Sequence, residues 1–251
     1  MPEAGATQFY LVIGLCALMV GLAKTGIPGL AILAIPLLAH VIPAKESSGF
    51  MLPMLIFGDI FAVLYYHRHA VWPHLVRLVP WTLTGVVTGA LAMKYLTDKE
   101  VGPLIGWIVI AMLALGWWRA RKAKAIEEAV GSGSLPWWVS GALGFLAGFT
   151  TMVANAAGPV MAIYLLAMRL PKNEFLGTGA WFFLAVNWIK VPFSVGLGLI
   201  TWQSLGINAL VFPIIAVGAF VGVRVQKRIP QRAFDIVVQV LAVAAAVKLV
   251  V

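Results

Sequence analysis

The chain has 251 residues, of which 62% are hydrophobic and 11% are charged, and its formal net charge is +9. A soluble domain of this size has too little interior to bury so much apolar surface, so the composition predicts an all-α polytopic membrane protein. The Lys and Arg residues lie between apolar segments rather than along one soluble face, which argues against nucleic acid as a partner. The only cysteine, Cys16, excludes an internal disulfide and a multi-cysteine metal site.

Ten apolar segments follow one another, at residues 7–23, 28–42, 46–66, 75–96, 101–118, 136–153, 157–170, 174–197, 203–226 and 232–250. No basic residue precedes the first, so a cleaved signal peptide is not expected. The second and the seventh are shorter than the ~20 residues that a spanning helix needs. Each can instead form a broken hairpin with the segment before it. We therefore expect eight to ten membrane segments.

The two halves of the chain repeat each other. Residues 34–49 and 162–177 are identical at eight of sixteen positions, and the interruption at residues 24–29 recurs at 155–159. Each half has an odd number of crossings, so the halves must be inserted in opposite directions. This predicts two inverted repeats, 1–118 and 136–251, joined by a linker at 119–135, as in carriers that work by alternating access. Alternatively, the Gly and Pro residues serve helix packing and kinks.

Positive charge predicts the orientation of the chain. Alternate loops carry twelve Lys and Arg residues on one side and four on the other. Because cytoplasmic loops are enriched in Lys and Arg, the linker 119–135 is expected in the cytoplasm and both termini outside it.

Three ionisable residues, Lys24, Asp59 and Lys190, lie inside or beside apolar segments, where charge is costly and is typical of functional sites. Asp59 aligns with Asn187 in the repeat, and Asn187 shares a helix face with Lys190, three residues on. Two cations and one acid leave a net positive interior, which favours an anion. Alternatively, Lys24 extends to the membrane interface, and Lys190 forms an internal ion pair with Asp59.

The interruptions at the start of each half supply further groups for an anion. Free backbone N–H groups and the positive end of a helix restarting there form an anion site, and nearby hydroxyl and amide groups add donors. The predicted substrate site comprises Lys24, Thr25, Gly26, Gly29, Thr150, Thr151, Asn155, Gly158, Asn187 and Lys190, with Asp59 for coupling or charge balance.

No enzyme motif, cofactor motif or metal motif is found in the sequence. His67, His69 and His74 cluster at a predicted membrane edge, where they form either an ordinary interfacial polar cluster or a metal site.

Several motifs resemble the sulfite and organosulfonate exporter family TauE/SafE over nearly the whole chain. The residues that carry the resemblance are Gly21-x-x-Lys24-Thr25-Gly26-x-x-Gly29, Pro36-Leu-Leu, Pro53, Asp59, Tyr65–Arg68, Gly148-Phe-Thr, Ala154–Pro159, Tyr164-Leu-Leu, Gly177-Thr, Phe182-Phe183, Asn187 and Lys190. The resemblance implies a carrier in the bacterial inner membrane that exports sulfite, a sulfonate or a related small anion. The alternative is an intramembrane enzyme or a membrane-embedded subunit of a larger complex. Homo-oligomerisation is left open.

Overall fold

In a computed structural model, the protein consists of helices and connecting loops, with no strand among the described residues, 5–26, 30–129, 135–225 and 247. This confirms the expected all-α class. The helices are α1 (Ala6–Thr25), α2 (Ala31–Leu38), α3 (Ala44–Tyr66), the short 3₁₀ helix η1 (His67–His69), α4 (Trp72–Tyr95), α5 (Asp98–Ala129), α6 (Trp137–Ala154), α7 (Gly158–Ala167), α8 (Lys172–Gly196) and α9 (Trp202–Val225).

Six of these helices, α1, α3, α4, α5, α6 and α9, are long and apolar enough to cross a membrane within the described part of the chain. Helix α8 has 25 residues and is also long enough, but it contains Glu174, Asn187 and Lys190. Helices α2 and α7 have only 8 and 10 residues, or about 12–15 Å, roughly half of the hydrocarbon thickness. They therefore do not span. The tenth predicted segment, 232–250, falls almost wholly outside the described residues.

Helices α3 and α8 begin in the same way because their sequences begin in the same way. Pro43 and Pro171 precede them in extended conformation, with ψ values of 138° and 150°, and Glu46 and Glu174 lie in the first turns. Proline has no N–H to leave unpaired at a helix start, and a carboxylate there faces the positive end of the helix dipole. The structure thus assigns both acids to helix starts.

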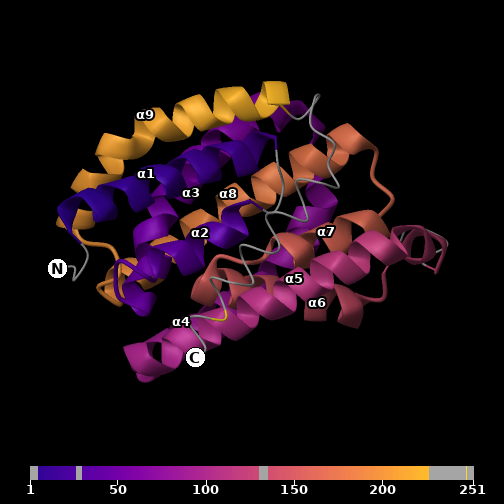
Figure 1. The fold of residues 1–251 in the computed structure, drawn as a ribbon. Helices are drawn as coiled ribbons and strands as arrows, with labels where there is room; N and C mark the ends of the chain where they lie inside the picture. The colour runs from indigo at the N-terminus through magenta and orange to yellow at the C-terminus, as the bar shows by residue number, and fades with distance from the viewer. Residues whose placement is uncertain (1–4, 27–29, 130–134, 226–246, 248–251) are drawn as a thin grey trace.

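The helices pack in long pairs (Figure 1). Helix α9 lies along α1 at one edge of the bundle, α6 lies along α4 at the other, and α3 packs against α8 between them. The half-length helices α2 and α7 fold back against α1 and α6, respectively. Helix α1 begins at the left end of the view, whereas α6 begins at the right end, close to the end of α5.

Glycines allow the two edge pairs to approach closely. A Cβ atom on Gly26 would overlap the backbone of Gly222, and one on Gly21 would overlap the carbonyl of Ile215, so α1 and α9 touch backbone to backbone. In the other pair, a Cβ on Gly148 would overlap the carbonyl of Thr82. Such contacts let van der Waals packing hold helices together where the surrounding lipid is as apolar as their side chains.

Helix α5 extends into the segment that the sequence predicts to be a linker. This helix has 32 residues and continues from the membrane segment to Ala129, so it is about 48 Å long. The first part of the predicted linker 119–135 is thus helical, and residues 130–134 lie outside the described part.

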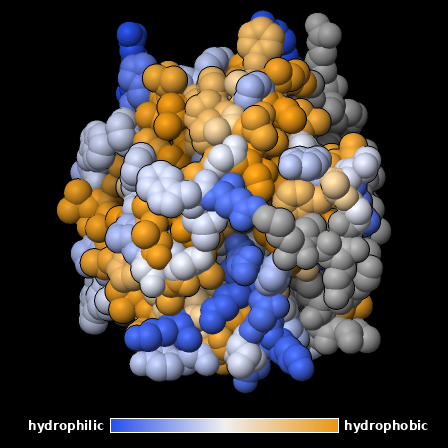
Figure 2. Space-filling model, turned by 90° about the vertical axis from the view of Figure 1, so that its left-hand side faces the viewer, coloured by the Kyte–Doolittle hydropathy of each residue, from blue (hydrophilic) through white to orange (hydrophobic). Residues whose placement is uncertain are grey.

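The polar surface is concentrated at the ends of the bundle. Figure 2 shows one end, where hydrophilic side chains gather in the lower middle of the view between apolar surfaces. Exposed charged residues lie where α4 ends and α5 begins, namely Lys94, Asp98, Lys99 and Glu100. The helix sides carry exposed Leu, Val, Phe and Trp instead. This distribution is typical of a protein whose sides face lipid.

Candidate functional site

The first contact in the interior joins the break after α1 to the middle of α3. The Nζ atom of Lys24 lies 2.6 Å from Oδ1 of Asp59, with the two side chains 13% and 1% exposed. The same ammonium lies 4.6 Å from the ring centroid of Phe183 on α8. Lys24 therefore points into the protein and forms a buried ion pair, and the alternative of an interfacial Lys24 does not hold in this structure.

The contacts continue from Asp59 across to α8. Asn187 donates a hydrogen bond from Nδ2 to Oδ2 of Asp59 at 2.6 Å. Its Oδ1 accepts a hydrogen bond from Nζ of Lys190 at 3.3 Å. Asp59 thus pairs directly with Lys24 and reaches Lys190 only through an amide. The alternative of a direct Lys190–Asp59 ion pair is not what the structure contains.

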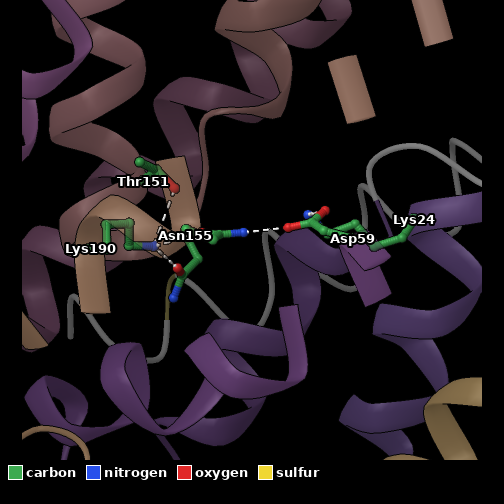
Figure 3. A network of polar contacts seen from close by, with 6 residues as sticks. Lys24, Asp59, Thr151, Asn155 and Lys190 are labelled. Carbon is green, nitrogen blue, oxygen red and sulfur yellow. Dashed lines mark hydrogen bonds and ion pairs between the residues drawn. The ribbon is translucent and has the colours of Figure 1, made fainter. Parts of the chain in front are cut away.

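Lys190 is held by two more groups, both at the end of α6 (Figure 3). Its Nζ donates to Oδ1 of Asn155 and to Oγ1 of Thr151 at 3.4 Å. Asn155 has a left-handed backbone conformation, with φ of 49°, at the C-terminal end of α6. Asparagine tolerates this conformation better than most residues, so the break between α6 and α7 itself directs the amide towards Lys190.

Ser48 links this end of the row to α3. The Nδ2 atom of Asn155 donates to the carbonyl of Ser48 at 3.0 Å, and the Ser48 hydroxyl donates to the carbonyl of Met152 at 2.9 Å. The row Lys24–Asp59–Asn187–Lys190–Asn155/Thr151 therefore connects both helix breaks with α3 and α8.

With Lys190 protonated, the row carries an uncompensated positive charge. Lys24 and Asp59 cancel, which leaves the charge of Lys190, whose side chain is 1% exposed. Its described contacts are all with neutral oxygens, on Thr151, Asn155 and Asn187. Burying an ammonium without an opposite charge is costly, so the arrangement favours an anion beside Lys190.

The contact between Asp59 and Asn187 joins two positions that are 128 residues apart. This separation equals the offset between the matching sequence segments 34–49 and 162–177.

Several predicted site residues lie outside the row. The Thr25 hydroxyl donates to the carbonyl of Ala219 on α9 at 2.7 Å, and the Thr150 hydroxyl donates to the carbonyl of Leu146 at 2.7 Å. The Thr25 hydroxyl therefore joins α1 to α9, as does Gly26 at its contact with Gly222, whereas the Thr150 hydroxyl bonds to the preceding turn of its own helix.

Of the two glycines predicted to lie where a helix restarts, the structure describes only Gly158. Gly158 is exposed at the start of α7, and a Cβ atom there would meet nothing within 4 Å. Gly29 lies outside the described residues.

The predicted histidine cluster does not converge on one point. His74 contacts the hydroxyl of Tyr164 at 3.2 Å, whereas His67 contacts the carbonyl of Leu64 at the end of α3. Among the described residues, no group of three or more His, Cys, Asp and Glu side chains is placed to hold a metal ion.

Two contributors to the row were not predicted from the sequence. Ser48 acts mainly through its backbone carbonyl, which any residue type supplies, so no sequence signal marks it. Phe183 lies in the apolar run Trp181–Leu184 and is among the residues that carry the family resemblance, but only its contact with Lys24 connects it with the row.

Comparison with known proteins identifies the class. The model of the sulfite exporter TauE/SafE family matches residues 13–249, so the chain belongs to this family of membrane transporters, which is not a family of enzymes. The chain matches none of the curated proteins and none of the solved structures with which it was compared. Together with the six apolar helices, the family defines a multi-pass membrane transporter.

Proposed function

We propose that this protein exports a small anion, sulfite or an organosulfonate, across the bacterial inner membrane. The observation that carries the proposal is Lys190, a buried cation whose described partners are all neutral. A monovalent anion beside it would bring the net charge of the row to zero. Family membership supports the same class of substrate, because the family is described by sulfite export.

The arrangement of helices supports transport by alternating access. The α1–α9 and α4–α6 pairs are packed backbone to backbone, and the row runs between them from Lys24 on α1 through α3 and α8 to the end of α6. Helix α7 begins at Gly158, three residues beyond Asn155, so its unpaired N–H groups are close to the row in the chain. Discontinuous helices whose N-termini meet anionic groups near the membrane midplane are typical of inverted-repeat carriers. Rocking of one edge pair against the other would expose the row to each side in turn.

Lys190→Met tests the proposal, since methionine keeps most of the side-chain length and removes the charge. Hydrogen bonds to charged groups contribute about 1.5–3 kcal/mol, so sulfite should bind about 10- to 150-fold more weakly. Lys94→Met is the matched control, because Lys94 is exposed at the end of α4. Binding is measured by the sulfite-dependent rise in melting temperature, and flux by uptake into liposomes.

The result that would overturn the proposed site is normal sulfite binding and flux by Lys190→Met. Lys190 would then be structural, and the anion would have to be sought at Lys24 and the helix breaks. Absence of sulfite or sulfonate flux through the unmodified protein would overturn the proposed function itself.

A further inference from the structure

The two amide partners of Lys190 are fixed as hydrogen-bond acceptors. Asn187 uses its Nδ2 for Asp59, and Asn155 uses its Nδ2 for the carbonyl of Ser48. An amide nitrogen only donates, so each of these contacts turns the Oδ1 atom of the same amide towards Nζ of Lys190. Neither amide can reverse without losing its bond to α3. Lys190 therefore always faces two acceptors from these residues.

The third partner, Thr151, is different because a hydroxyl both donates and accepts. Its Oγ1 lies 3.4 Å from Nζ of Lys190, and no other acceptor for its O–H is found within the described residues. A charged ammonium has three donors, which match Asn155, Asn187 and Thr151. A neutral amine has two donors and a lone pair, which match the two amides and the rotated O–H of Thr151. Each hydrogen-bonding position of Lys190 Nζ therefore has a partner in both protonation states.

Asp59, in contrast, cannot change its protonation state without losing a contact. One of its oxygens contacts Lys24 at 2.6 Å and the other accepts from Asn187 at 2.6 Å. Protonating Asp59 would leave Lys24 as a second unbalanced cation. Removing the proton of Lys190, in contrast, brings the net charge of the row to zero and breaks no ion pair.

We propose that Lys190 carries one proton across the membrane together with each anion, so that a monovalent anion moves without net charge. This rests on the proposed function. The proton passes from water on the open side to the Nζ lone pair of Lys190, and the anion binds beside the ammonium. On the opposite side both leave, and the Thr151 O–H turns back to the amine. The empty carrier then returns without a buried charge, which avoids the cost of desolvation.

Other charged groups around α8 do not enter the row. Helix α8 packs against α3, α4, α7 and η1. His67, Arg68 and His69 of η1 and His74 and Arg77 of α4 belong to the end where α8 begins, near Glu174. Glu174 is sixteen residues before Lys190, or about 24 Å along the helix axis. Helices α6 and α7 contain no Asp, Glu, Lys, Arg or His. Lys24 and Asp59 are therefore the charges that face Lys190 from its described surroundings.

The experiment uses the purified full chain in liposomes with isethionate, a sulfonate that has no titratable group near neutral pH. At zero membrane potential, a difference of one pH unit should concentrate the probe about tenfold on the alkaline side, as expected for one proton per anion. A potential of about 60 mV without a pH difference should have no effect, although it would give tenfold accumulation if the anion moved alone.

Two variants distinguish the carrier of the proton. Lys190→Arg keeps a charge at all pH values, so the pH difference should no longer drive accumulation and the potential should do so instead. Lys94→Met, at an exposed position at the end of α4, is the control and should keep pH-driven accumulation.

Each of the following results would refute the proposal that Lys190 carries the proton. Retention of pH-driven accumulation in Lys190→Arg, as in Lys94→Met, would exclude Lys190 as the carrier of the proton. Potential-driven flux through the unmodified protein would refute proton coupling and leave the proposed function intact. Absence of any isethionate and sulfite flux through the unmodified protein would refute both.

Discussion

The ion pair between Lys24 and Asp59 can be tested by a double-mutant cycle with Lys24→Met and Asp59→Asn. The two side chains are 13% and 1% exposed and contact each other at 2.6 Å. Removing one partner of a buried pair leaves an uncompensated charge and typically costs about 3–5 kcal/mol of unfolding free energy. Lys24→Met should have the larger effect, because the carboxylate that it leaves behind is the more buried of the two. After Asp59→Asn, the ammonium of Lys24 still lies over the ring of Phe183.

The double variant removes both charges together. Replacing a buried pair by neutral groups is often nearly neutral, so we expect a loss of no more than about 2 kcal/mol. For a chain of this size 1 kcal/mol corresponds to about 2–4 °C, so each single variant should melt about 6–20 °C lower and the double variant less than about 8 °C lower. Thermal unfolding of the purified protein in detergent measures this. If the two single losses add to the double loss within about 0.5 kcal/mol, the two residues are not coupled and the reasoning fails.

The remaining predictions concern the packing of α6 against α4, the helix start at Gly158 and the orientation of the chain in the membrane. Gly148→Ala should lower the yield of folded protein, because the new Cβ meets the Thr82 carbonyl and overpacking costs about 1–3 kcal/mol. Gly158→Val should fold, since its Cβ meets open space, but should lose anion transport because the side chain would block the helix start. Folded yield and liposome flux measure the two effects, and normal transport by Gly158→Val would exclude an anion at this helix start. An impermeant thiol reagent applied to intact cells should spare Glu128→Cys and label Pro2→Cys, with Cys16 buried and unreactive; the opposite labelling would reverse the orientation.

Much of the fold follows from the order of residues along the chain. Apolar segments of sufficient length must form helices in lipid, because the bilayer offers no partner for free backbone groups. Pro43 and Pro171, each followed by an acid, locate the starts of α3 and α8. The breaks that the sequence predicts at residues 24–29 and 155–159 correspond to the ends of α1 and α6, before α2 and α7 begin.

The charged residues of the candidate site were also identifiable, but their partners were not. Lys24, Asp59 and Lys190 stand out because charge inside an apolar segment is costly. The sequence left open whether Asp59 pairs with Lys190, and the structure pairs it with Lys24 and places Asn187 between. Thr25 and Thr150 had the right chemistry for an anion, yet their hydroxyls bond to helix carbonyls.

The physical reason is that helical periodicity determines which residues of one helix share a face, not which helix that face meets. In a soluble protein the apolar face of each helix marks the side that turns inward. Here the helices are apolar on all sides, because lipid and protein interior are both apolar, so composition does not distinguish the two. The sequence alone therefore determines a helical membrane protein with two breaks and three interior charges. Only the tertiary structure, through the packing of α3 against α1 and α8, decides that these charges form one row in which Lys190 contacts neutral oxygens.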